Sequence, residues 1–284
     1  MRGLATDAAG LYHARPGTGA VPSMLHIHPV PAFSDNYIWV LHDEAGNALA
    51  VDPGDAGPVI AFLQTHRLRL TGILITHHHL DHTGGVAALR GHFGDIEVHG
   101  PAPSPFAGIS QAACPETELR LLGRSAKVIS VPGHTLDHIA YFIAAEEGQP
   151  PVLLCGDTLF AGGCGRVFEG DPGMMYASLQ RLAALPDDTR VCCAHEYTLS
   201  NLRFARAVEP SNEDLLQRQA RDSATRDLDL PTVPSTLSLE RGTNPFLRCA
   251  EAAVRAAATQ HAGRELAGAA DVFAVIRSWK DGYR

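Results

Sequence analysis

The sequence predicts an α/β protein of the α+β kind that ends in a helical domain. Up to about residue 198, short apolar segments typical of strands are interrupted by amphipathic helices. Beyond that position only helical periodicity remains. With 284 residues, 45% of them hydrophobic, the chain can bury a full core in one main domain and a smaller second one. We expect the main domain at residues 25–198 and the helical domain at residues 199–284.

Residues 1–24 differ in composition and periodicity from the rest of the chain. They are rich in Gly, Ala and Pro and show neither helical nor strand periodicity. We therefore expect a flexible N-terminal extension, and Met24 could be a natural start.

The elements of the main domain follow in order from residue 25. Apolar and β-branched runs predict three strands, the third ending in a Pro-Gly turn, and apolar residues at helical spacing predict the helix after them. A short apolar strand and a helix that stops at a glycine come next, followed by further strands around one more helix. The expected strands are 25–33, 36–43, 47–55, 71–76, 96–100, 126–133, 137–144, 151–157 and 189–196, and the expected helices are 57–68, 84–94 and 174–185.

The C-terminal part of the chain carries helical patterns separated by a proline-rich connector at 231–235. The expected helices are 201–209, 212–227, 246–260 and 269–282.

Composition limits the function classes. Lys plus Arg number 23 and Asp plus Glu number 31, and the resulting net charge of −8 opposes a nucleic-acid partner. The six cysteines form no CxxC pair and no secretory stretch precedes them, so we expect reduced thiols in a cytoplasmic protein. No apolar run is long enough to span a bilayer, and we expect a soluble monomer that does not bind membranes.

The stretch THHHLDHTGG at residues 76–85 lies in a strand-to-helix loop, where α/β proteins usually place their chemistry. If the chain is still extended there, His77 and His79 point the same way and can share one metal ion, while His78 faces elsewhere. Asp81 and His82 lie where the helix begins and can face a second point. Imidazole combined with carboxylate suits zinc, iron or manganese better than calcium or magnesium.

Three further candidate ligands each follow an apolar strand. His134 stands in VPGHT, Asp157 in LLCGDTLF and His195 in VCCAHEY. A polar residue after a buried strand is common, so each alone says little. Together they supply further ligands at one edge of a sheet.

These motifs, THHHLDH, PGHT, GDTLF and AHE in this order, resemble those of metallo-β-lactamase-fold hydrolases. A closer similarity to the hydroxyacylglutathione hydrolase (glyoxalase II) family rests on FSDNYIWVL, VDPGD, GDTLFAGGCGRVFEG, HEYTLSNLRFA and PSTLSLERGTNPFLR. The resemblance extends from Leu25 to the end of the chain. It implies a four-layer αββα sandwich carrying the catalytic centre, followed by a helical substrate-binding domain.

The resemblance also implies a ligand set for two divalent metal ions, most simply zinc, with iron or manganese as alternatives. His77, His79 and His134 would hold the first ion, Asp81, His82 and His195 the second, and Asp157 would bridge both. A hydroxide between the ions would attack the thioester of S-D-lactoylglutathione, releasing glutathione and D-lactate. This reaction is the final step of methylglyoxal detoxification.

Further roles follow from the same resemblance. Arg166, Tyr197 and Arg248 match positions that contact glutathione. Phe168 stands where some members have tyrosine, and no basic residue follows Arg248 before Arg255, so substrate affinity is open. Around the metals, His138 either supports the site or caps a strand, and Asp52 either orients a ligand histidine or shapes its turn. Cys155, Cys192 and Cys193 are expected to be small core residues.

The sequence supports other functions less well. A mononuclear-iron persulfide dioxygenase of the same superfamily needs only two histidines and one carboxylate. The second candidate ligand group and the NPFLR-containing tail favour the hydrolase. A β-lactamase or lactonase leaves Arg248 unexplained, a nuclease conflicts with the net charge, and a non-enzymatic module would be expected to lose ligands.

Overall fold

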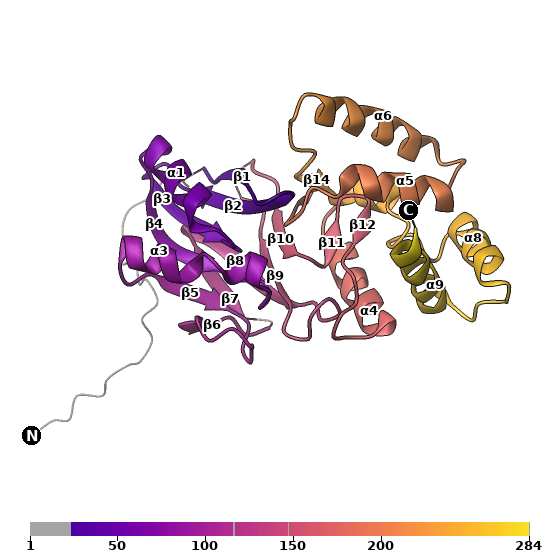
Figure 1. Ribbon diagram of the computed structural model, residues 1–284, viewed down its shortest axis with the longest axis horizontal. Helices are drawn as coiled ribbons and strands as arrows, with labels where there is room; N and C mark the ends of the chain where they lie inside the picture. Colours follow the sequence, from indigo (N-terminus) through magenta and orange to yellow (C-terminus); the bar gives the residue numbers. More distant parts are fainter. Residues whose placement is uncertain (1–23, 116, 147, 284) are drawn as a thin grey trace, which may run out of the picture.

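The computed structural model describes residues 24–115, 117–146 and 148–283. Apart from Met24, the expected N-terminal extension lies outside the described residues. Two sheets pack face to face with helices on their outer sides, and the C-terminal helices gather at one end (Figure 1). The predicted αββα sandwich with a helical C-terminal region is confirmed.

The first sheet has six strands in the order β1-β2-β3-β4-β5-β6. β1 to β3 pair antiparallel, whereas β3 to β6 pair parallel. The parallel strands therefore end on the same side, where the loop after β4 emerges. The strands are β1 (His26–Ala32), β2 (Asn36–His42), β3 (Asn47–Val51), β4 (Arg69–Leu74), β5 (Glu97–Gly100) and β6 (Gln111–Ala112).

The second sheet also has six strands, in the order β14-β13-β10-β9-β8-β7. Its β10 and β13 are parallel neighbours, so the segments that follow them begin side by side. A separate β11-β12 hairpin follows β10. The strands are β7 (Glu118–Leu121), β8 (Arg124–Ser130), β9 (Ile139–Ile143), β10 (Val152–Gly156), β11 (Leu159–Phe160), β12 (Gly163–Cys164), β13 (Arg190–Cys193) and β14 (Ser235–Thr236).

The helices occupy the outer layers and the C-terminal end of the molecule. α1 is capped by the side chain of Asp55, and α4 by that of Asp171 with a proline in its first turn. The helices are α1 (Ala56–His66), α2 (Leu80–Thr83), α3 (Val86–Phe93), α4 (Pro172–Ala183), α5 (Thr198–Val208), α6 (Glu213–Asp227), α7 (Leu237–Thr243), α8 (Ala252–Ala262) and α9 (Ala269–Gly282).

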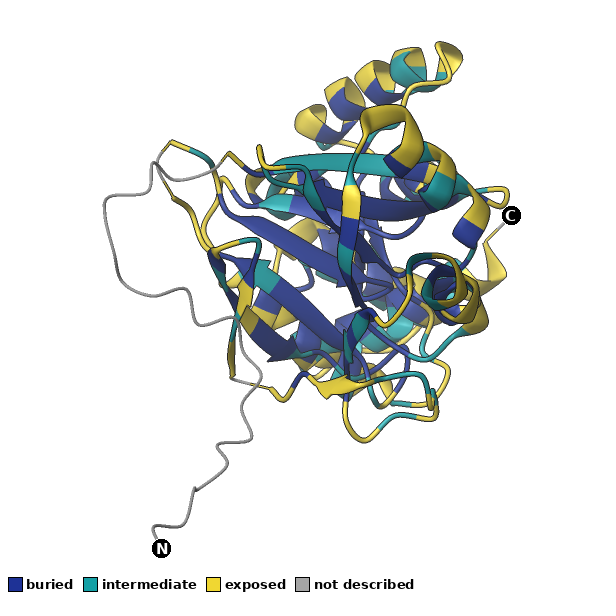
Figure 2. Ribbon diagram, turned by 90° about the vertical axis from the view of Figure 1, so that its left-hand side faces the viewer, coloured by how far each residue is buried: buried dark blue, intermediate teal, exposed yellow. Residues whose placement is uncertain are grey.

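Two apolar cores hold these layers together. One lies between the first sheet and the helices α1 and α3, and the other joins the two sheets to α4 and the C-terminal helices. Burial follows the same division, since the central strands of both sheets are buried and exposure collects on the outer sides of the helices and in the loops (Figure 2). Cys155, Cys192 and Cys193 belong to the second core, as predicted.

The helical end is tied to the β11-β12 hairpin through one buried carboxylate. Glu240 of α7 accepts a hydrogen bond from the backbone N–H of Gly162 at 2.8 Å, and its other oxygen accepts from the guanidinium of Arg218 at 2.6 Å. Asn244 donates to Glu240 and also to the carbonyl of Gly163. Arg218 and Glu240 are almost fully buried, so their charges compensate each other in a place that excludes water.

Some elements differ from the prediction. The predicted helix at 246–260 begins only at Ala252, because the Asn244 side chain accepts from the Phe246 N–H and holds a turn after Pro245. Five short strands and the two short helices α2 and α7 were not predicted. Among the described residues, no helix combines the length and the apolar character needed to cross a membrane.

Candidate metal centre and substrate cavity

The loop after β4 carries the first four candidate ligands. β4 ends at Leu74, and the chain stays irregular through His77 and His79 before α2 begins at Leu80. His77 Nε2 lies 3.0 Å from His79 Nδ1, so these two side chains face one point, as their spacing predicted.

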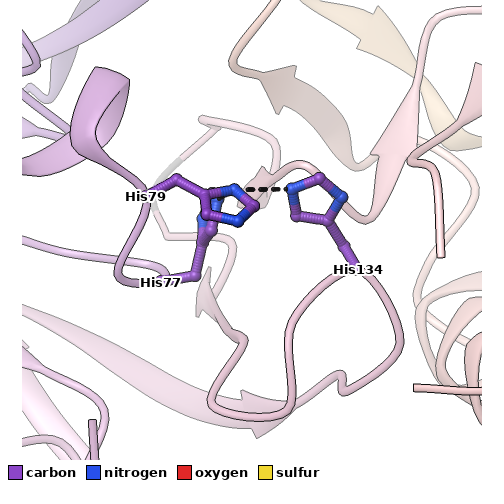
Figure 3. A group of neighbouring side chains, drawn as sticks. All are labelled: His77, His79 and His134. Carbon is purple, nitrogen blue, oxygen red and sulfur yellow. Dashed lines mark hydrogen bonds between the residues drawn. The ribbon is translucent and has the colours of Figure 1, made fainter. Parts of the chain in front are cut away.

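His134 completes a group of three imidazoles. Its Nε2 lies 3.0 Å from His79 Nδ1, and the three rings converge from the loop after β4 and the loop between β8 and β9 (Figure 3). One nitrogen of each ring lies within 4.8 Å of the others. Burial lowers the pKa of all three histidines, which favours neutral rings with free lone pairs. Such a group can hold a metal ion.

A second group consists of Asp81, His82 and His195, whose ligand atoms also lie within 4.8 Å of one another. His82 Nε2 lies 3.5 Å from Asp81 Oδ2, and His195 Nε2 lies 3.6 Å from the same oxygen. His195 follows β13 and reaches this group across the site. The side chain of Asn36 donates to Asp81 Oδ2 at 3.1 Å and fixes that carboxylate.

Asp157 lies between the two groups. Its Oδ2 is 3.4 Å from His134 Nε2, while its Oδ1 is 3.3 Å from His195 Nε2 and 3.5 Å from His82 Nε2. Gly156, the last residue of β10, has a φ of +47°, and this turn directs the carboxylate into the site. Each oxygen therefore faces a different group.

The buried polar atoms of the site fit metal ions. Both ring nitrogens of His82 and Oδ1 of Asp157 are buried without a partner in hydrogen-bonding geometry. The nearest charged atoms are at ion-pair distances: His82 Nδ1 lies 3.1 Å from Asp52 Oδ2, and His82 Nε2 lies 3.5 Å from Asp157 Oδ1. Burial opposes charge on both residues, yet their attraction raises the pKa of His82 and lowers that of Asp157. Unsatisfied buried atoms are costly, and a cation among them would remove that cost.

The outward nitrogens of these rings are fixed by neighbours. His134 Nδ1 donates to the backbone carbonyl of Arg166 at 2.9 Å, and His77 Nδ1 lies 3.0 Å from the Thr76 hydroxyl. His195 Nδ1 lies 2.8 Å from Asp35 Oδ1. Metal-binding histidines characteristically have such partners, which leave the inward nitrogen free.

Asp52 and His138 support the same centre. Asp52 adopts a φ of +52° after β3 and accepts two hydrogen bonds from Thr76, and its Oδ2 lies 3.1 Å from His82 Nδ1. His138 accepts the backbone N–H of Asp157 at 3.1 Å, and its ring stacks on His77 at 4.6 Å. Burial lowers the pKa of His138 to about 3, so it remains a neutral acceptor.

A cavity of about 520 Å³ opens beside the metal centre. The predicted substrate contacts Arg166, Phe168 and Tyr197 line it together with candidate ligands. Phe168 is 61% exposed and presents its edge to His134 at 5.2 Å between ring centres. Tyr197 stacks on His195 at 4.8 Å. Two aromatic walls therefore border the metal centre.

The structure does not place Arg248 where the resemblance implied. Arg248 does not line the cavity; its guanidinium binds both carboxylate oxygens of buried Glu209 at 2.8 and 3.0 Å and also donates to the carbonyl of Arg241. The turn after Pro245 directs the side chain toward α5. The role of Arg248 in the structure is to pair with Glu209.

Two cationic residues of the cavity were missed. Arg277 and Lys280 lie one turn apart on α9 and line the cavity. Arg277 donates to the carbonyl of Cys164, and its other amino group donates to Asp281. Lys280 donates to the carbonyl of Ser200. An IRSWKD segment resembles any amphipathic helix, and only the packing of α9 against the main domain reveals its position.

Comparisons with known proteins match two consecutive parts of the chain to two families. Residues 32–195 match a family described as "Metallo-beta-lactamase superfamily", and residues 196–283 match one described as "Hydroxyacylglutathione hydrolase C-terminus". A hydroxyacylglutathione hydrolase from Albidiferax ferrireducens is 53% identical over 257 residues, covering 90% of this chain and 99% of the relative. The enzyme of that name from Nitrosomonas europaea is 46% identical, covering 92% and 97%.

Solved structures share the fold. ETHE1 from Myxococcus xanthus superimposes with a TM-score of 0.57 at 25% identity, covering 78% of this chain and 83% of that one. TTHA1623 in a di-iron-bound form gives a TM-score of 0.55 at 27% identity, covering 78% of this chain and all of the other.

Proposed function

The chain belongs to the hydroxyacylglutathione hydrolase family, and we propose that it hydrolyses the thioester S-D-lactoylglutathione to glutathione and D-lactate. The observation that carries the proposal is the cavity in which two groups of candidate metal ligands face cationic side chains from α9. Family membership gives the reaction, and this arrangement supports both of its requirements, metal binding and recognition of an anionic substrate.

We propose that the first group holds one divalent ion, that the second holds another and that Asp157 contributes to both. The fit rests on the converging imidazoles and the unpartnered buried atoms of His82 and Asp157. When bound, two such ions would supply a hydroxide nucleophile at neutral pH and polarise the thioester carbonyl. Zinc suits this donor set, as do iron and manganese, and the di-iron form of the related structure supports a two-ion site.

The residues of the chain would bind and orient the substrate. Glutathione carries two carboxylates and one ammonium, so its net charge is negative. Arg166, Arg277 and Lys280 place positive charge in the cavity and would attract these carboxylates. Phe168 and Tyr197 would enclose the part of the substrate nearest the metal centre. Because a thiolate is a good leaving group, the protein need not provide an essential general acid.

Two of the candidate ligands, Asp157 and His195, have fixed orientations. His138 holds the backbone of Asp157, and Asp35 holds His195. These contacts hold the Asp157 carboxylate and the His195 imidazole in orientation toward the candidate metal centre before the substrate binds. Such preorganisation lowers the cost of reaching the reactive geometry.

The test is a thioesterase assay with S-D-lactoylglutathione, combined with metal analysis. Wild-type protein should release free thiol and bind two ions per chain. Asp157→Ala should lose activity and metal together, whereas Asp227→Ala, at the end of α6, should change neither. Fully loaded wild-type protein without thioesterase activity would disprove the proposal.

The persulfide dioxygenase alternative predicts a different result. It requires one iron per chain and oxygen consumption with glutathione persulfide. The family match over residues 196–283 and the second candidate ligand group favour the hydrolase.

The remaining expectations belong to the same proposal. We propose a role in methylglyoxal detoxification, a cytoplasmic location and a monomer. We further propose a catalytic domain at 25–198 and a substrate-binding domain at 199–284, since the cavity combines ligands from the former with Arg277 and Lys280 from the latter.

A further inference from the structure

A second histidine cluster lies outside the metal centre, on β1, β2 and α1. His26 and His28 are two residues apart on β1 and point to the same face of the sheet. His42 on β2 pairs directly with His26 and is the diagonal neighbour of His28. His66 lies in the last turn of α1, which covers this face. None of the four residues contributes to the cavity.

Two nitrogens of the cluster face each other. His28 Nε2 lies 3.2 Å from His42 Nε2, and the rings are nearly parallel, with centres 5.2 Å apart. The His66 ring lies 6.1 Å from that of His28, centre to centre. Phe62 contacts the rings of both His28 and His66 and limits their movement.

Backbone carbonyls determine which nitrogen of two rings carries a proton. His42 Nδ1 lies 3.1 Å from the carbonyl of Asp43, and His66 Nδ1 lies 2.9 Å from that of Phe62. A carbonyl can only accept, so each Nδ1 must be the donor. In the neutral rings Nε2 is then left with a free lone pair, as in histidines that bind metals.

The environment of His28 favours the uncharged ring. Burial, followed by the nearby imidazoles of His42, His66 and His26, lowers the pKa of His28. Without a metal, His28 Nε2–H can donate to His42 Nε2. With a metal, His28 need only shift that proton to Nδ1, and both Nε2 lone pairs become ligands.

We propose that His28 and His42 form a second binding site for a divalent transition-metal ion; His66, whose ring centre lies 6.1 Å from that of His28, would have to turn toward the pair to act as an auxiliary ligand. The facing nitrogens and the carbonyl-fixed ring of His42 carry this inference. Imidazole ligands select zinc, copper or nickel over calcium and magnesium. His66 is exposed and offers a further free nitrogen, whereas His26 stacks on His42 at 4.6 Å and packs against the pair.

The experiment compares zinc binding by fully loaded wild-type protein and four variants, which are His28→Gln, His42→Gln, His66→Gln and His92→Gln. Each is dialysed against free Zn²⁺ on the order of 10 µM, and bound zinc is measured by elemental analysis. His42→Gln should retain one ion fewer per chain than wild type, with thioesterase activity unchanged. His66→Gln should weaken the additional site by a smaller factor. His92→Gln, an exposed histidine on α3, is the matched control and should bind as wild type does.

A second measurement uses Cu²⁺ as the probe. Electron paramagnetic resonance of the loaded protein with one added equivalent of Cu²⁺ should show coupling to two nitrogens, and His28→Gln should remove it. Equal zinc in wild type and both His28→Gln and His42→Gln would overturn the proposal. So would equal loss in His92→Gln. Because the readout is a difference in bound metal between active proteins, it stands apart from the test of thioester hydrolysis.

Discussion

His78 Nδ1 lies 3.0 Å from Asp137 Oδ1. The other ring nitrogen lies 3.3 Å from Glu169 Oε1, so one side chain links the ligand loop after β4 to two further loops. Asp137 also accepts from Ser104 and Thr135. The histidine that faces away from the metal centre therefore connects the loops that build it.

We expect His78→Ala to reduce kcat/KM about tenfold, because contacts that support metal-site loops have effects of this size. Steady-state thioesterase kinetics would measure the loss, and metal analysis would show whether affinity falls with it. His92→Ala is the control. Unchanged kinetics in His78→Ala would show that the three loops keep their positions without this link.

Gly54→Ala should disturb the metal centre through sterics alone. A Cβ added at Gly54 would lie 1.9 Å from the backbone oxygen of Asp81, so the ligand loop would have to move. We expect weaker binding of the second metal ion and a loss of kcat. In Gly91→Ala the added Cβ meets nothing within 4 Å, and this helical variant should keep full activity. Equal activity of the two variants would contradict the close contact.

Alanine substitutions of Lys280 and Arg248 should have different effects on KM and on stability. Lys280→Ala should raise KM about tenfold with little change in kcat, because it removes a charge-assisted contact to a substrate carboxylate. Arg248→Ala should leave KM unchanged and instead lower the free energy of unfolding by about 2 kcal/mol, because Glu209 would keep a buried charge without its partner. Enzyme kinetics and denaturant titration would distinguish the two outcomes. A raised KM in Arg248→Ala would restore its predicted binding role.

Substrate binding should weaken at alkaline pH. Burial, together with the nearby charges of Arg277 and Arg203, lowers the pKa of Lys280 to about 8. Lysine is charged below its pKa and neutral above it, so attraction for a carboxylate is lost as pH rises through about 8. A profile of kcat/KM against pH should fall in that range, and Lys280→Arg should remove the fall because a guanidinium stays charged. An identical fall in the variant would assign it to another group.

Much of the metal centre could be predicted because its residues sit in short local motifs after apolar strands. Neighbouring parallel strands end at the same edge of their sheet. The loop after β4 therefore emerges beside the end of β3, and Asp157, after β10, lies next to His195, after β13. The orienting partner Asp35 could not be predicted in the same way. It lies 160 positions from His195 in the sequence, and a single aspartate in a turn carries no signal of its own.

The substrate side of the cavity was harder to predict. Arg277 and Lys280 belong to a helix whose pattern shows which face is buried but not which surface it meets. The position of Arg248 was hard to predict for a related reason, because the sequence around Pro245 does not reveal that the turn points the side chain at Glu209. Short strands such as β11 and β12 arise from tertiary pairing of two residues each and leave no periodicity to read.

The carboxylate of Glu240 connects the helical tail to the main domain. It fixes the hairpin that follows Asp157 while belonging to α7, and Arg218 of α6 neutralises it. If the chain were cut after residue 198, the Gly162 N–H would lose its acceptor and the hairpin its support. The helical tail therefore supports the hairpin beside the candidate metal centre as well as lining the cavity.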